Sequence, residues 1–227
     1  MNFLTKLLAL AAVGGSLMNG AMDTALPNLD ADGTLILVNR ENPISSTFIP
    51  PVREAKVSGS LREMQEEAAA ALEEMFAACR KETRAKMVCI SGYRPYDKQR
   101  RIYDRKLENV RGSVEKANEY VAPPGTSEHQ TGLAMDVGQD GSSADLIESY
   151  KNTKSGKWLK ENAHRFGFII RYPQEWEDVT GYRYEPWHVR YVGADHAARI
   201  FEEQIPLETY IQNLRMTLLF DIIEQDD

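Results

Sequence analysis

Apolar and small residues recur every three to four positions between residues 58 and 82. The recurring positions are Leu61, Met64, Ala68, Ala71, Leu72, Met75, Phe76 and Cys79. This spacing predicts a long amphipathic helix over Ser58–Glu82, with one apolar face. Ser60 suits the N-cap position, and Glu63 completes the capping-box pattern three residues later.

Short apolar runs bounded by turn residues predict strands elsewhere. These runs cover residues 35–38, 87–90, 133–137, 168–171 and 187–192. Helical patterns cover residues 96–108, 157–166, 194–204 and 207–219. Helices alternate with strands, but no clean strand–helix–strand unit appears. We therefore expect an α+β fold, in which a small, mostly antiparallel sheet packs against several helices.

The N-terminus has the layout of a secretory signal. Lys6 precedes an apolar run from Leu7 to Val13, small and polar residues follow, and Asp23 is the first acidic residue. We predict a signal peptide over 1–21, a polar lead-in over 22–34, a main domain over 35–205, and a C-terminal helix with an acidic tail over 206–227. The alternatives are an uncleaved amphipathic leader, which would tether an exported protein to the membrane, and a buried helix.

Composition narrows the class of protein. The chain has 227 residues, of which 42% are hydrophobic and 27% charged, as in folded soluble proteins. Its formal charge of -7 argues against nucleic-acid binding, which needs a basic face. Cys79 and Cys89 are the only cysteines. An even count after an export signal slightly favours a disulfide, and two small buried apolar side chains are the alternative.

Two polar segments next to predicted strands offer metal ligands. His129 and Asp136 lie in SEHQTGLAMD, and His188 lies in YEPWHVR. A hydrolytic zinc site needs three nitrogen or oxygen ligands and one open position. Each segment alone is more often a surface turn or a structural histidine, but their joint occurrence beside apolar strands favours zinc. Glu185 precedes His188 across a proline, so it could stand near a metal-bound water without being a ligand.

A third segment, SGYRPYDKQ, places Arg94 where a predicted strand ends. A fixed guanidinium there could hold a carboxylate or an oxyanion, and the alternative is a solvated loop arginine. His164 and His196 fall in helical patterns and are interpreted as helix-surface or packing residues. Residues 144–155 carry no assignable motif and are a candidate wall of a substrate groove.

The three segments together, in this order, closely resemble the VanY-type D-alanyl-D-alanine carboxypeptidases. These are zinc peptidases of the superfamily that also includes lysostaphin and sonic hedgehog. The resemblance covers residues 35–205. It implies a zinc ion bound by His129, Asp136 and His188, with Glu185 as the catalytic base. It also implies that Arg94 stabilises the oxyanion or grips the peptide, while the terminal D-alanine is contacted by Gln99 and Ser127.

The implied activity is removal of the terminal D-alanine from peptidoglycan stem peptides, in cell-wall metabolism. Export fits this substrate, and neither nucleic acid nor another protein partner is implied. An L,D-carboxypeptidase or an endopeptidase of the same fold remains open. A non-catalytic zinc-containing wall-binding module is a further alternative, which the presence of Glu185 disfavours. A nucleophilic Ser127 served by His129 is disfavoured because no G-x-S-x-G motif surrounds it.

Overall fold

The computed structural model describes residues 33–143 and 145–225, with side chains described through residue 218. Its main compact unit spans Leu37–Glu208, and residues 33–36 and 209–225 group separately. The predicted signal peptide (1–21) and nearly all of the lead-in (22–34) lie outside the described residues. Within the described part of the chain, no helix has the length and apolar character needed to cross a membrane.

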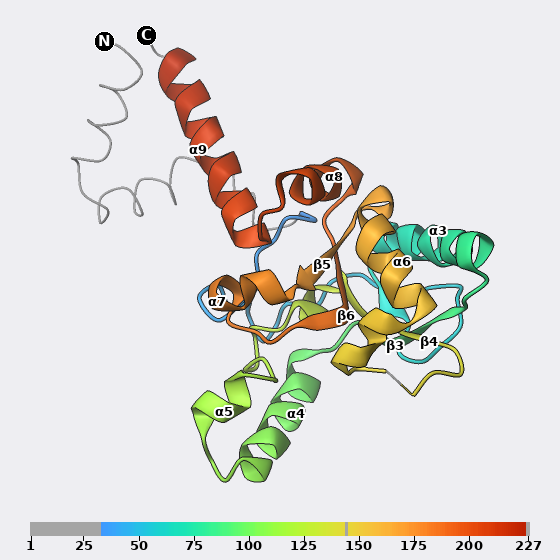
Figure 1. The fold of residues 1–227 in the computed structure, drawn as a ribbon. Helices are drawn as coiled ribbons and strands as arrows, with labels where there is room; N and C mark the ends of the chain where they lie inside the picture. The colour runs from blue at the N-terminus through green and yellow to red at the C-terminus, as the bar shows by residue number, and fades with distance from the viewer. Residues whose placement is uncertain (1–32, 144, 226–227) are drawn as a thin grey trace. The chain divides into compact units, whose positions relative to one another are not determined.

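A four-stranded antiparallel sheet forms the centre of the main unit (Figure 1). Its order is β3 (Met87–Ser91), β4 (Ala134–Gln139), β6 (Glu185–Tyr191) and β5 (Phe168–Tyr172). Each neighbouring pair is antiparallel. The α+β fold and these four predicted strands are therefore confirmed, with boundaries that differ by at most two residues.

The two faces of the sheet differ in chemistry because successive side chains point to opposite sides. Met135 pairs with Val189, and both side chains are fully buried. The next pair along the strands, Asp136 and His188, therefore faces the other way. Helices α3 (Glu66–Thr83) and α6 (Lys154–Asn162) pack against each other and against strands of this sheet. One face is thus core, and the other carries ionisable groups.

Helix α3 begins eight residues later than its apolar pattern predicts, at Glu66. Glu63–Met64 instead form the short strand β2, which pairs with β1 (Arg53–Glu54). The backbone N–H of Ser60 donates to the carbonyl of Cys89, so Ser60 is not the N-cap and no capping box forms. The predicted start was wrong because these backbone groups hydrogen-bond to distant segments instead of to the next helical turn.

The predicted strand over residues 35–38 was also wrong, because the segment adopts a turn and irregular structure. Val38 is nevertheless fully buried. A run of apolar residues indicates that a segment is buried. To become a strand, the segment must also pair its backbone N–H and C=O groups with a neighbouring strand.

Both cysteines are free thiols, so the tentative disulfide was wrong. Cys79 on α3 and Cys89 on β3 are 0% and 1% exposed, which confirms the alternative of small buried side chains.

Five further helices lie along the described part of the chain. They are α4 (Tyr96–Asn109), α5 (Val114–Asn118), α7 (Glu177–Thr180), α8 (Ala194–Glu203) and α9 (Leu207–Gln225). The short helices α5 and α7 were not predicted. A 3-10 turn, Ala163–Phe166, extends α6. It ends at Gly167, whose φ of 78° suits a residue without a side chain, as the sequence indicates.

Candidate metal centre and cleft

The register of β4 and β6 brings two candidate ligands together. Asp136 and His188 are direct partners across the two strands and share one face. Nδ1 of His188 lies 3.0 Å from Oδ1 of Asp136. Pairing of two sequence segments 52 residues apart thus places an imidazole against a carboxylate.

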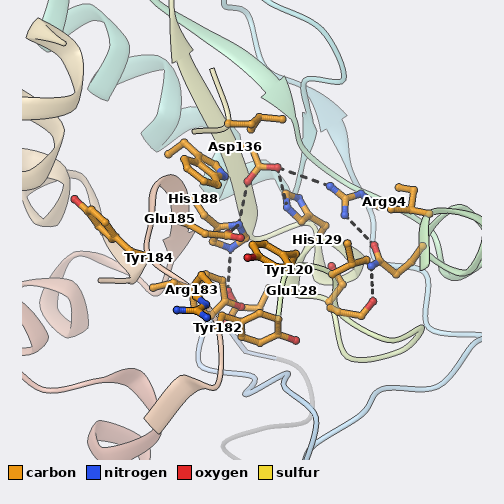
Figure 2. A pocket seen from close by; sticks show the side chains of 18 of the residues that line it. Arg94, Tyr120, Glu128, His129, Asp136, Tyr182, Arg183, Tyr184, Glu185 and His188 are labelled. Carbon is orange, nitrogen blue, oxygen red and sulfur yellow. Dashed lines mark hydrogen bonds and ion pairs between the residues drawn. The ribbon is translucent and has the colours of Figure 1, made fainter. Parts of the chain in front are cut away.

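His129 completes the group from a 3-10 helix, η1 (Glu128–Thr131), that precedes β4. Its Nε2 lies 3.2 Å from Oδ2 of Asp136, and its ring meets that of His188 edge to face at 5.0 Å. One ligand atom from each of His129, Asp136 and His188 falls within 4.8 Å of the others, and all three residues are buried (Figure 2). Two imidazoles and a carboxylate fit the donor set of a zinc site that keeps an open position.

The partner of each ring determines which nitrogen can bind a metal. Nδ1 of His129 lies 2.9 Å from the carbonyl oxygen of Gly92, which can only accept, so Nδ1 carries the proton and Nε2 is free to bind. Nε2 of His188 faces Oε2 of Glu128 at 3.3 Å, while its Nδ1 faces Asp136. The two histidines therefore turn different nitrogens towards Asp136.

Electrostatics favour the neutral form of His129 and the anionic form of Asp136, as metal binding needs, but they favour the protonated form of His188, which must release a proton to bind a metal. Burial lowers the pKa of His129, and the charge of Arg94 lowers it further. Burial alone would raise the pKa of Asp136, but both histidines hold it well below its usual range. For His188, burial is outweighed by its bonds to Asp136 and Glu128, which raise its pKa to about 9. Asp136 is thus an anion between two rings, as a ligand must be.

Glu185 stands beside this group at the start of β6. Its Oε2 lies 3.9 Å from Nδ1 of His188, and its side chain is 20% exposed. Burial raises the pKa of Glu185 to about 7, and the negative charge of Asp136 adds to the rise while His188 opposes it. A carboxylate poised near neutral pH can accept and return a proton.

Arg94 enters the same site from the segment after β3. A register shift between Cys89 and Ser91 moves Ser91 to the face of Asp136. Nη2 of Arg94 donates to Oγ of Ser91 at 3.0 Å and lies 3.7 Å from Oδ2 of Asp136. Nη1 donates to Oε1 of Gln99 at 2.8 Å. Arg94 is therefore a held guanidinium, and the alternative of a solvated loop arginine is excluded by this geometry.

Gln99 and Ser127 lie in the cleft wall but differ in what they can offer. Gln99 is 1% exposed, and its amide nitrogen already donates to the carbonyl of Ala122 at 2.6 Å. In this structure Gln99 orients Arg94, and its predicted contact with D-alanine stays a prediction. Ser127 is 5% exposed. Both ring nitrogens of His129 face other partners, which disfavours a Ser127 nucleophile with His129 as its base.

The three candidate metal ligands line a cavity of about 650 Å³. Its aromatic lining consists of Tyr120, Tyr172, Tyr182, Tyr184 and Trp187. Leu146, Ile147 and Glu148 add a further wall. They belong to the segment over 144–155 for which the sequence offered no motif, and they border the cavity as its predicted role requires. This volume suits a small ligand or a peptide end.

Buried charges behind the cleft were not found from the sequence. Glu128 has a fully buried side chain and contacts Arg171 on β5 and Arg190 on β6, each at 2.8 Å. Arg171 also bonds Glu208, the second residue of α9, at 2.5 Å and 3.1 Å. Arg171 follows two isoleucines in β5, and Arg190 lies between a valine and a tyrosine in β6. Because buried charges are rarely left unpaired, an arginine among such neighbours was the available signal in the sequence.

His164 and His196 lie apart from the metal group, as predicted. His164 follows α6 and stacks on Phe201 with ring centroids 3.7 Å apart. His196 lies in the first turn of α8. Burial lowers the pKa of each ring.

A family model described as VanY, D-alanyl-D-alanine carboxypeptidase, matches residues 61–194. Among curated relatives, the protein named putative carboxypeptidase YodJ of Bacillus subtilis is 42% identical over 193 residues, which cover 81% of this chain and 69% of YodJ. A D-alanyl-D-alanine carboxypeptidase of Enterococcus faecalis is 38% identical over 189 residues, which cover 80% and 67%.

Two solved structures are similar in fold and sequence. The LD-carboxypeptidase LdcB superposes with a TM-score of 0.74 at 41% identity, covering 78% of this chain and 86% of that one. The vancomycin-resistance D,D-pentapeptidase VanY, solved in complex with Zn(II), superposes with a TM-score of 0.67 at 37% identity, covering 78% and 98%.

Proposed function

Because the chain belongs to the VanY family of D-alanyl-D-alanine carboxypeptidases, it is a zinc-dependent carboxypeptidase, and we propose that its cleft removes the terminal D-alanine from peptidoglycan stem peptides. The observation that carries this proposal is the convergence of three metal-ligand side chains, a carboxylate of raised pKa and a held guanidinium on one cavity.

Zinc would be held by His129, Asp136 and His188. When bound, zinc supplies a Lewis acid that polarises a carbonyl and makes water a stronger acid. All three side chains line the cavity, so a peptide end that enters it would reach the metal.

Glu185 acts as the general base and then as the general acid. Its carboxylate takes the proton of the attacking water and afterwards delivers that proton to the amine of the departing D-alanine. A pKa of about 7 suits both halves of this cycle, because the group releases a proton as readily as it takes one near neutral pH.

Arg94 meets the negative charge that develops on the scissile carbonyl oxygen. Gln99 and Ser91 hold two of its nitrogens, so the guanidinium is oriented before the substrate binds. Ser127, in the cavity wall, contacts the terminal D-alanine. A chain with a formal charge of -7 needs such a local cation to accept a substrate that carries a free carboxylate.

The similarity to an LD-carboxypeptidase supports a second candidate, cleavage after an L-centre in a tetrapeptide stem. The deciding experiment incubates the zinc-loaded protein separately with purified stem pentapeptide, stem tetrapeptide and cross-linked muropeptides and follows the products by mass spectrometry. We expect the pentapeptide to be cleaved faster. Faster cleavage of the tetrapeptide would assign the L,D activity, and internal cleavage of cross-linked muropeptides would assign an endopeptidase. No cleavage of any of them would favour the binding module.

Export is the expected location, because peptidoglycan lies outside the cytoplasm and residues 1–21 have the layout of a signal peptide. Expression of the full chain in a secreting bacterium, followed by fractionation and N-terminal sequencing, tests this. A processed N-terminus near residue 22 is expected in the external fraction. An intact N-terminus with all protein in the cytoplasm would contradict export.

A further inference from the structure

Glu128 contacts His188 at Nε2, whereas the other ring nitrogen, Nδ1, faces Asp136. Its carboxylate is shared unequally: Oε1 accepts from Nε of Arg171 and from Nη1 of Arg190, both at 2.8 Å. The other oxygen, Oε2, faces Nε2 of His188 at 3.3 Å (Figure 2). The two guanidinium groups thus leave one oxygen for the histidine.

This arrangement determines the chemistry that Glu128 can offer. Oε1 of Glu128 forms ion pairs with Arg171 and Arg190, both at 2.8 Å, so the fully buried carboxyl is held as an anion. An ionised carboxylate only accepts hydrogen bonds. Nε2 of His188 must therefore be the donor, and when this ring binds a metal in its neutral form, Nδ1 must carry the lone pair.

We propose that Glu128 is a positioning residue that keeps the proton of His188 on Nε2 and so presents Nδ1 to the metal. This role rests on the proposed zinc ligand set and extends it. For His129 the same task falls to a backbone carbonyl, that of Gly92. For His188 the acceptor is a side chain, that of Glu128, because the backbone groups next to His188 are paired within the sheet. A hydrogen-bond acceptor behind a metal-bound histidine both orients the ring and strengthens it as a ligand.

Substitution Glu128→Gln tests this with almost no change of shape. The two arginine donors at the Oε1 position select the amide oxygen of glutamine, which turns its NH₂ group towards Nε2 of His188. The ring must then accept at Nε2 and hold its proton on Nδ1, where the proton competes with zinc. We expect zinc affinity, measured by competition with a chromophoric chelator, to fall about 10- to 100-fold.

Glu208→Gln is the matched control. It alters a carboxylate that bonds the same Arg171, at the start of α9, but leaves the partner of His188 unchanged. Both variants weaken the buried charge chain, so both should lower the melting temperature. Only Glu128→Gln should lower zinc affinity strongly. A parallel loss of zinc affinity in the two variants would show that Glu128 has only a structural role and overturn the proposal.

A measurement on the unaltered protein covers the case in which Glu128→Gln does not fold. In zinc-loaded protein with ¹⁵N-labelled histidine, NMR should show His188 protonated at Nε2 and His129 protonated at Nδ1. A proton on Nδ1 of His188, or a Glu128→Gln variant with unchanged zinc affinity, would refute the role of Glu128 alone. Failure of the unaltered protein to bind zinc would instead refute the ligand set, and the proposal with it.

Discussion

Two glutamates flank His188, and their surroundings shift their pKa values in opposite directions: the pKa of Glu128 is lowered and that of Glu185 is raised. Glu128 contacts two arginines, which hold its pKa well below the usual range against the effect of burial. For Glu185, burial outweighs the opposing charges of His188 and Arg94 and raises the pKa to about 7. When two carboxyl groups have pKa values separated in this way, they take different roles. Glu128 stays an anion, and Glu185 can take up and release a proton. At the scale of single residues, the surroundings decide the role.

Glu185→Gln removes the proton carrier while keeping the shape of the side chain. We expect kcat to fall about 10²- to 10⁴-fold, the usual contribution of a general acid–base group, with stoichiometric zinc retained. Steady-state kinetics and elemental analysis measure the two quantities. Glu148→Gln, which changes an exposed carboxylate on the cavity wall, should leave kcat nearly unchanged. Loss of zinc from Glu185→Gln would make Glu185 a ligand and contradict its assignment.

Arg94→Lys keeps the positive charge but loses the planar fork that bonds Ser91 and Gln99. If Arg94 stabilises the oxyanion, kcat should fall about 10²-fold or more, with a much smaller rise in KM. Kinetics on a stem pentapeptide separate the two constants. A rise in KM at constant kcat would assign Arg94 to ground-state binding instead. Arg183→Lys, at an exposed cavity-lining arginine, is the control and should change kcat little.

At the scale of elements, strand register builds the site. Pairing of β4 with β6 sets Asp136 opposite His188, and the shift in β3 between Cys89 and Ser91 turns Ser91 towards Arg94. Because side chains alternate along a strand, a slip of one residue would move each of these groups to the core face. The core face in turn receives the apolar side chains of α3, where Cys79 is buried.

Both cysteine thiols should be unreactive in the folded protein. Burial raises the pKa of Cys89 to about 12 and also raises that of Cys79. The thiolate, which is the reactive form, is therefore scarce at neutral pH, and reagent access is blocked. An aromatic disulfide reagent should titrate no thiol in the native protein and two in denaturant. Fewer than two thiols in denaturant would indicate a disulfide and contradict the structure.

At the scale of the whole molecule, the metal group joins parts of the chain that are distant in sequence. Its ligands come from η1, β4 and β6, and the charge chain behind them continues to Glu208 at the start of α9. Asn39 also donates to Glu208 at 3.3 Å. Both Asn39 and Glu208 lie outside the segment that matches the family model. The support of the site therefore draws on nearly the full length of the main unit.

Removal of zinc should consequently lower thermal stability. A ligand at a hundredfold excess over its Kd adds about 2.7 kcal/mol to the free energy of unfolding, which for a chain of this size corresponds to roughly 5–10 °C in Tm. Calorimetry before and after chelation measures this, and added zinc should restore the lost stability. A His129→Ala, His188→Ala double variant should show no zinc-dependent shift. An equal shift in that variant would place the stabilising zinc elsewhere.

The sequence by itself determined the chemistry and the regular elements with strong local patterns. His129, Asp136, His188, Glu185 and Arg94 were selected from residue type and flanking segments, and the structure gathers them around one cavity. Most strands and long helices were predictable because their periodicity is a property of neighbouring residues. The end of the α6 helical stretch at Gly167 followed in the same way from the glycine.

Only the tertiary structure decided features that depend on distant partners. The start of α3 moved because Ser60 bonds the backbone of Cys89, and residues 35–38 were buried without becoming a strand. The partners of Glu128 lie 43 and 62 residues away along the chain. Local patterns carry no information about which distant group will meet a backbone N–H or a buried carboxylate. Packing alone makes that choice, and with it the side of His188 that faces the metal.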